Sequence, residues 1–140
     1  MSYRNLKQLG FSNYYSISPN KENNLFYLKN IPRVSGVYII TANKKIPRLK
    51  GGSKIIYIGK TNNLRNRIKI LFKHLIPENT YKISYNHTAR EGLMEIINET
   101  EYSPSIIYLE YSKPKKLESK LLLAYRKCHI ETPPLNNQRK

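Results

Sequence analysis

The chain contains no aspartate and no tryptophan, and it has only one cysteine in 140 residues. All nine acidic residues are glutamates, whereas 25 residues are lysine or arginine. Two-metal sites need several converging carboxylates, so this composition favours chemistry with one metal ion or none. The single cysteine, Cys128, excludes a disulfide framework and a thiolate zinc cluster. It lies among apolar residues of an expected helix, which predicts a small buried side chain.

Long apolar runs are also missing. No segment approaches the roughly 20 apolar residues that a membrane span requires, and the N-terminal residues lack the apolar core of a secretory signal. These absences predict a cytosolic protein without a membrane partner, and no motif points to an organic cofactor. The formal charge of +16 predicts a polyanionic partner, because a folded domain this basic repels itself.

The length of 140 residues predicts a single domain. Residues 1–30 are polar and aromatic without a clear period, so we interpret them as an N-terminal extension that either packs or contacts DNA. Residues 31–140 alternate between β-rich runs and runs with helical spacing. We expect strands at 34–41, 54–58 and 105–111, and helices at 63–75, 87–99 and 114 to about 130. The pattern predicts an α+β fold with the order β-β-α-α-β-α, with residues 81–85 ambiguous between strand and loop.

Residues 42–53 contain proline, a Gly-Gly pair and several basic residues, which predicts a loop between the first two strands. A basic loop beside an active site could hold a phosphate backbone, although an ordinary solvated loop has the same composition. The candidate nucleic-acid-binding residues are basic side chains in or near this loop and in the following helix: Lys44, Lys45, Arg48, Lys50, Lys54 and Arg65.

Residues 55–72 form a junction at which a strand passes into a helix. Gly59 is expected to let the backbone turn without a Cβ clash, and residues 61–63 suit a helix N-cap. The sequence Gly-Lys-Thr at this junction is compatible with a phosphate-binding P-loop, but that motif needs a glycine five residues earlier. Position 54 is a lysine, so the spacing excludes a P-loop.

Five sequence elements resemble, in the same order, the motifs of the GIY-YIG nuclease family: Gly36-Val37-Tyr38, Tyr57-Ile58-Gly59-Lys60, Arg67, Leu117-Glu118 and Pro133-Pro134-Leu135-Asn136. The resemblance implies a small three-stranded antiparallel sheet flanked by helices. It also implies hydrolysis of phosphodiester bonds in DNA with the help of one Mg²⁺ or Mn²⁺ ion. The chain departs from the family in its long segment at residues 42–53, and in Leu71, where several branches carry a histidine.

The resemblance assigns roles to six residues, which are Tyr38, Tyr57, Lys60, Arg67, Glu118 and Asn136. Glu118 would hold the metal, since carboxylate oxygens suit Mg²⁺ and Mn²⁺; from the pattern alone it could instead pair with a lysine such as Lys115. Arg67 would bind the scissile phosphate with its planar guanidinium, and Arg65 is the competing choice. Asn136 would bond the phosphate or fix a neighbouring group.

The two tyrosines would position or deprotonate the attacking water. A phenol has a pKa near 10, so it needs nearby positive charge to act as a base, and Lys60 and Arg67 could supply that charge. The absence of a histidine at position 71 favours Tyr57 and Lys60 as the pair that handles the proton. Which tyrosine activates the water stays open.

We therefore expect a stand-alone DNA endonuclease, of a restriction, repair, junction-resolving or homing type. A single active site cuts one strand, so both a monomer and a homodimer are compatible with the sequence. Two alternatives stay open, a non-catalytic nucleic-acid-binding module and an RNA-directed nuclease.

Overall fold

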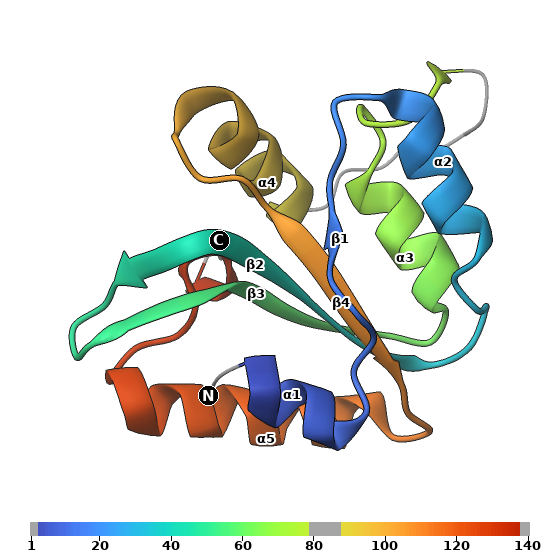
Figure 1. Cartoon of the computed structure of the whole chain (residues 1–140). Helices are drawn as coiled ribbons and strands as arrows, with labels where there is room; N and C mark the ends of the chain where they lie inside the picture. Colours follow the sequence, from blue (N-terminus) through green and yellow to red (C-terminus); the bar gives the residue numbers. More distant parts are fainter. Residues whose placement is uncertain (1–2, 79–87, 138–140) are drawn as a thin grey trace.

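The computed structural model describes residues 3–78 and 88–137. The ambiguous segment 81–85 and the first residue of the helix expected at 87–99 lie outside the described residues. Four strands form one antiparallel sheet in the order β1-β4-β2-β3 (Figure 1). The strands are β1 (Tyr15–Ser16), β2 (Gly36–Pro47), β3 (Gly52–Thr61) and β4 (Ser105–Glu110).

The expected α+β class with an antiparallel sheet is confirmed, but the expected number of three strands is wrong. The additional strand is β1, in which Tyr15 pairs with Ile106 and Ser16 with Ser105. Two residues are too few to show the alternation of apolar and polar side chains that marks a strand in a sequence. Strand β1 therefore depends on a partner about 90 residues away.

The loop expected at residues 42–53 is also wrong. Strand β2 continues to Pro47 and β3 begins at Gly52, where the two residues pair with each other. The connection is a short turn in which the Arg48 N–H donates to the Gly51 carbonyl at 2.9 Å. Pro47 and Gly52 lie at the ends of their strands, where neither residue interrupts the hydrogen-bond ladder. The composition of residues 42–53 is typical of a loop, but backbone pairing between β2 and β3 extends the hairpin through this segment.

The helices cover both faces of this sheet: α1 (Tyr3–Leu9), α2 (Lys21–Lys29), α3 (Leu64–Leu71), α4 (Thr88–Glu99), α5 (Pro114–His129) and the short 3₁₀ helix η2 (Pro134–Asn137). Helices α2, α3 and α4 lie on one side of the sheet and α1 and α5 on the other (Figure 1). The expected N-cap is confirmed at Asn63, whose side chain accepts from the Asn66 N–H at 3.1 Å. No helix within the described ranges is long and apolar enough to cross a membrane.

Each face of the sheet has its own hydrophobic core. The core under α2, α3 and α4 includes Tyr38 and Ile40 from β2, and the core under α1 and α5 includes Val37 and Ile39. Neighbouring residues of a strand point to opposite faces, which explains this division. Residues 3–33 contribute to both cores through four buried side chains: Leu6, Phe11, Leu28 and Ile31.

Asn24 of α2 is fully buried and uses both ends of its side-chain amide. Its Oδ1 accepts from the Tyr15 hydroxyl at 2.6 Å and from the Ser18 N–H at 3.0 Å. Its Nδ2 donates to the Ser18 carbonyl at 2.9 Å and to the Leu75 carbonyl at 2.7 Å. These bonds connect the N-terminal segment to the chain that follows α3.

The buried face of α5 does not include Cys128, which is exposed. The buried residues follow one another at intervals of four: Leu117, Leu121, Tyr125 and His129. The prediction that Cys128 is buried is therefore wrong. Tyr125 and His129 lie next to each other on this buried face, with ring centroids 4.6 Å apart.

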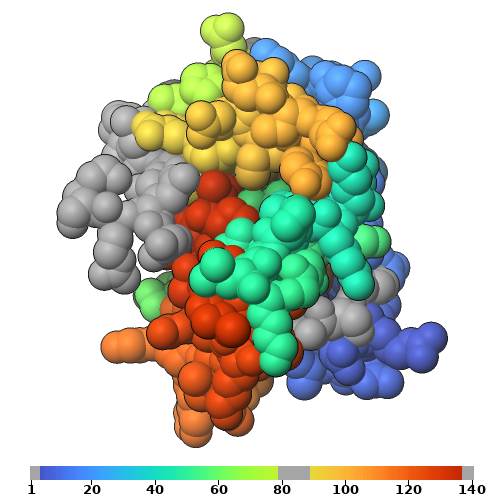
Figure 2. All heavy atoms as spheres, turned by 90° about the vertical axis from the view of Figure 1, so that its left-hand side faces the viewer, coloured from blue at the N-terminus to red at the C-terminus, as the bar shows by residue number. Residues whose placement is uncertain are grey.

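The tip of the β2–β3 hairpin lies against the C-terminal end of α5 (Figure 2). Arg48 donates to the Thr132 carbonyl at 2.6 Å and forms an ion pair with Glu131 at 3.0 Å. The Leu49 N–H donates to the same glutamate at 2.6 Å. These contacts hold the tip of the hairpin against the residues that follow α5.

Candidate active site

Tyr38 and Tyr57 lie side by side on one face of the β2–β3 pair. Tyr38 is opposite Gly59, and Tyr57 is opposite Ile40. The ring centroids are 5.8 Å apart and the ring planes are inclined by 39°. Both rings therefore project from the same face of the β2–β3 pair.

The structural role of Gly59 differs from the expected one. It lies inside β3 and has no positive φ, so it does not form a turn. A Cβ at this position would lie 2.5 Å from Cζ of Tyr38 and 2.6 Å from Cε2 of Tyr57. Glycine is needed here because both rings lie directly over its Cα.

Burial controls the protonation of both phenols. Burial raises the pKa of Tyr38 well above its usual value; Tyr57 raises it further, and the Arg67 guanidinium lowers it. Burial also raises the pKa of Tyr57, a hydrogen bond with Tyr38 lowers it, the charge of Glu118 raises it and that of Arg67 lowers it. The Tyr38 hydroxyl is close enough to its neighbours to respond to them, yet it forms no hydrogen bond of standard geometry with a described residue. Both phenols are therefore neutral near pH 7 unless further positive charge arrives.

Glu118 lies in the second turn of α5, directly after the buried Leu117, and is itself half-buried. Burial raises the pKa of its carboxyl group, and the charge of Lys60 lowers it. The charge of Glu118 in turn raises the pKa of Tyr57, so the three side chains are coupled electrostatically. The carboxylate has no hydrogen bond or ion pair with any described residue, so the pairing with Lys115 is not formed.

A divalent ion at this place would depend on Glu118. In the described part of the chain, no three histidine, cysteine or acidic side chains come together as a metal site. A half-buried carboxylate with no ion pair among the described residues fits Mg²⁺ or Mn²⁺, which bind through one or two carboxylates and keep several waters. Within the described part of the chain, the donor set is compatible with such an ion.

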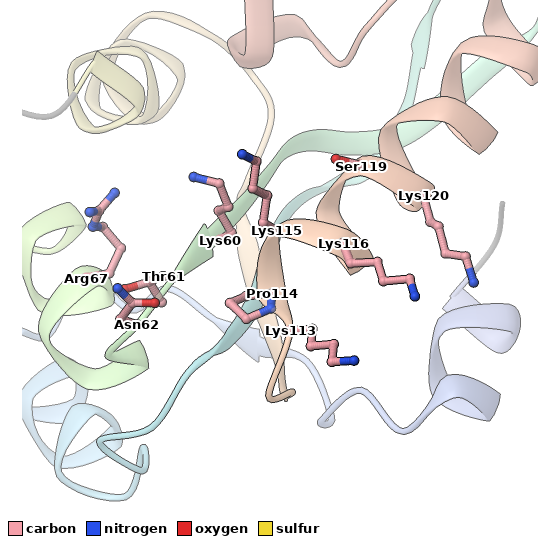
Figure 3. Close-up of a pocket in the computed structure, with 10 residues that line it drawn as sticks. All are labelled: Lys60, Thr61, Asn62, Arg67, Lys113, Pro114, Lys115, Lys116, Ser119 and Lys120. Carbon is pink, nitrogen blue, oxygen red and sulfur yellow. The ribbon is translucent and has the colours of Figure 1, made fainter.

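Lys60 and Arg67 line a cavity of about 880 Å³ between β3, the N-terminal end of α3 and the N-terminal end of α5 (Figure 3). Lys60 is exposed at the end of β3, and Arg67 extends from the first turn of α3. The influence of Arg67 on both tyrosines shows that this guanidinium reaches the same place. An ammonium and a guanidinium that face one cavity can hold an oxyanion.

Asn136 binds the backbone of β3 rather than facing the cavity. Its Oδ1 accepts from the Ile58 N–H at 2.9 Å, and its Nδ2 donates to the Ile58 carbonyl at 2.7 Å. Since β3 is the edge strand, the side-chain amide acts as a further pairing partner for the residue between Tyr57 and Gly59. The preceding Leu135 is buried and occupies the space beside Gly92, where a Cβ would lie 2.5 Å from its Cδ2.

The two arginines of α3 differ in their surroundings. Arg65 donates to the Ile31 carbonyl at 2.7 Å and to the Lys29 carbonyl at 3.1 Å, so it binds the C-terminal end of α2. It does not line the cavity that contains Arg67. The structure thus separates the two candidates that the sequence left open for phosphate binding.

The basic residues of the hairpin are only partly accessible. Lys44 forms an ion pair with Glu101 at 2.6 Å, and Arg48 is held by Glu131 and Thr132. The remaining candidates are exposed: Lys45, Lys50 and Lys54. None of these five residues lines the cavity beside Arg67.

Sequence analysis missed the basic residues at the start of α5. Four lysines of this segment line the cavity together with Lys60 and Arg67: Lys113, Lys115, Lys116 and Lys120. The signal was present as a run of lysines around Pro114, directly before the candidate metal ligand. The first turn of α5 contains no acidic residue, although helix N-termini favour negative charge.

Comparison with protein families gives one match. A model of the GIY-YIG catalytic domain matches residues 34–128, which is more than half of the chain. The matched part contains Tyr38, Tyr57, Lys60, Arg67 and Glu118, and it ends before Asn136. No curated protein and no solved structure matches significantly.

Proposed function

Because the chain belongs to the GIY-YIG family, we propose that it is a metal-dependent endonuclease that hydrolyses phosphodiester bonds in DNA. The observation that carries the proposal is the position of Glu118. Its half-buried carboxylate forms no ion pair with any described residue. The charge of Lys60 lowers the pKa of this carboxyl group, and the charge of Glu118 raises the pKa of Tyr57. A structural glutamate in so basic a protein would be expected to pair with one of the surrounding lysines.

In this proposal Arg67 and Lys60 bind the scissile phosphate and offset its charge. Arg67 is suited to oxyanions because its planar guanidinium offers parallel N–H donors. The substrate phosphate would enter the cavity that both residues line. Stabilising the developing charge on the phosphoryl oxygens is the largest contribution that a protein makes to such a reaction.

Tyr57 is the better candidate for the residue that contacts the water, because Tyr38 is fully buried and Tyr57 is partly exposed. Tyr57, as the phenolate that Lys60 and a bound ion would stabilise, would orient one water for attack on phosphorus and accept its proton, becoming the neutral phenol. Attack forms the new P–O bond and breaks the bond to the leaving oxygen, which takes up a proton from solvent. Tyr38, which is fully buried, would hold the ring of Tyr57 in position.

The Glu118 carboxylate would hold the divalent ion at this site. When bound, such an ion supplies Lewis-acid stabilisation of the phosphoryl oxygen and lowers the pKa of water. Positive charge at this place also opposes the effect of burial on the phenol, whose pKa is otherwise raised. The ion and the tyrosine are thus expected to depend on each other.

The test is incubation with plasmid, branched and single-stranded DNA in Mg²⁺ and in EDTA, followed by mapping of the cut ends. We expect Glu118→Gln to bind DNA with affinity close to that of the wild type and to lose cleavage by at least about a hundredfold, since metal stabilisation is worth several kcal/mol. Unchanged turnover in this variant would remove Glu118 from the mechanism. Tight, salt-dependent binding with no nicking in any divalent ion would instead identify a non-catalytic binding module.

A further inference from the structure

The N-terminal end of α5 carries an unusual concentration of positive charge. Lys113 is the N-cap residue but makes no side-chain capping bond, and Pro114 follows it. The backbone N–H groups of a helix N-terminus already present partial positive charge. Lysines at this place are unfavourable for the free helix, so an external anion is the natural complement.

Residues of this segment line the same cavity as the proposed catalytic cations. The cavity, of about 880 Å³, is lined from one side by β3 and α3 and from the other by α5 (Figure 3). Besides the lysines and Arg67, the cavity is lined by the polar side chains of Thr61, Asn62 and Ser119. Hydroxyl and amide groups of this kind commonly bind phosphate and sugar oxygens. The four α5 lysines form no ion pair with any described residue.

Three of the lysines form a stripe along α5. Lys113, Lys116 and Lys120 are spaced by three and four residues, so they share one face of the helix, and all three are exposed. Figure 3 shows their side chains extending to one side of α5, whereas Lys60 and Lys115 extend to the other. At a rise of about 1.5 Å per residue the stripe is roughly 10 Å long. This matches about three phosphates of one strand, which follow one another every ~3.4 Å along a duplex axis.

We propose that the substrate strand passes from this cavity over the start of α5, and that Lys113, Lys116 and Lys120 bind the phosphates next to the scissile one. The inference rests on the proposed function, since Lys60 and Arg67 in the cavity then hold the scissile phosphate. The α5 stripe, and not the basic β2–β3 hairpin, supplies most of the backbone contacts. The hairpin is the weaker candidate because Lys44 and Arg48 are already paired with glutamates.

The experiment compares two variants with the same change in net charge. One is Lys113→Gln/Lys116→Gln/Lys120→Gln, and the other is the hairpin variant Lys45→Gln/Lys50→Gln/Lys54→Gln. Binding to a fluorescently labelled DNA duplex is measured by anisotropy in EDTA, between about 50 and 200 mM salt. Each lost phosphate contact lowers the slope of log K against log salt by ~0.9. We expect the slope to fall by about 2 to 3 for the α5 variant, with a loss of affinity of about tenfold or more, and by less than about 1 for the hairpin variant.

Folding is checked by thermal melting of both variants. The α5 variant should melt no lower than the wild type, because it removes positive charge from a helix N-terminus. A slope equal to that of the wild type, or a larger fall in the hairpin variant, would overturn the inference. If the wild type cleaves DNA while the α5 variant keeps the full slope, the inference fails and the proposed function stands. If the slope falls as expected but no divalent ion supports cleavage, the strand path over α5 stands and the proposed function fails.

Discussion

Replacing Asn136 with alanine removes both hydrogen bonds between its side-chain amide and the backbone of Ile58. Ile58 is fully buried, so its N–H and carbonyl at the strand edge lose partners that only water could replace. A hydrogen bond contributes about 0.5–1.5 kcal/mol to stability, and an unsatisfied buried group costs about 1–3 kcal/mol. Asn136 is only half-buried, so water can enter, and we expect a loss of about 1–2 kcal/mol.

The expected loss is measured by chemical denaturation and thermal melting. For a domain of this size each kcal/mol corresponds to about 3–5 °C, so the melting temperature should fall by roughly 3–10 °C. Asn66→Ala is the matched control, because this asparagine is exposed on α3 and its replacement should change stability little.

A second substitution, Asn136→Asp, tests the geometry. The carboxylate could still accept from the Ile58 N–H but would place an oxygen against the Ile58 carbonyl, where the amide now donates at 2.7 Å. We expect this variant to be at least as unstable as the alanine variant at pH 7. It should recover in part below about pH 4, where the protonated acid can donate again.

Cleavage distinguishes a role in the fold from a role at the substrate. If Asn136 acts by holding the strand that carries Tyr57, lost activity must be accompanied by lost stability. A variant that melts like the wild type but no longer cleaves would refute this reasoning and return Asn136 to the substrate.

Three further predictions concern single residues. Gly59→Ala should cost about 1–3 kcal/mol by overpacking and should impair cleavage, because its Cβ would lie 2.5–2.6 Å from atoms of Tyr38 and Tyr57; denaturation and cleavage assays check both effects, and a fully stable variant would contradict the close contact. Ile130→Gly should stabilise the protein by about 1 kcal/mol in denaturation experiments, since Ile130 is exposed and has a φ of 65°, which is strained for a β-branched residue; a loss of stability would argue against the left-handed cap. Burial raises the pKa of Glu118 in the folded protein, so its contribution to stability falls as the pH rises above the pKa of the unfolded chain. Metal-free Glu118→Gln should therefore melt above the wild type at pH 7 and level with it near pH 4, and a lower melting temperature at pH 7 would contradict the raised pKa.

The part of the site that sequence analysis predicted is the part set by local spacing. The register of one hairpin places Tyr38 and Tyr57 on a common face, and the start of α3 follows from the cap at Asn63. Those relations involve short segments whose periodicity is visible in the sequence. The position of Glu118 beside Tyr57 depended on the family resemblance, because no local pattern connects α5 to β3.

The remaining features depend on contacts between distant residues. Asn136 meets Ile58 across 78 residues, and the pattern around Asn136 resembles that of any polar segment. The sequence made Arg48 a candidate for binding nucleic acid, whereas in the structure it forms an ion pair with Glu131. Gly92 of α4 leaves room for Leu135 of η2, a contact between residues that are far apart in the sequence.

The cores of the protein extend beyond the segment that defines its family. The family match covers residues 34–128, yet Leu6 and Phe11 fill one core, and Leu28, Ile31 and Leu135 fill the other. The segment that matches the family is therefore shorter than the segment that folds as one domain. Anyone who trims the chain to the matched segment should expect both faces of the sheet to lose part of their cover and the product to aggregate.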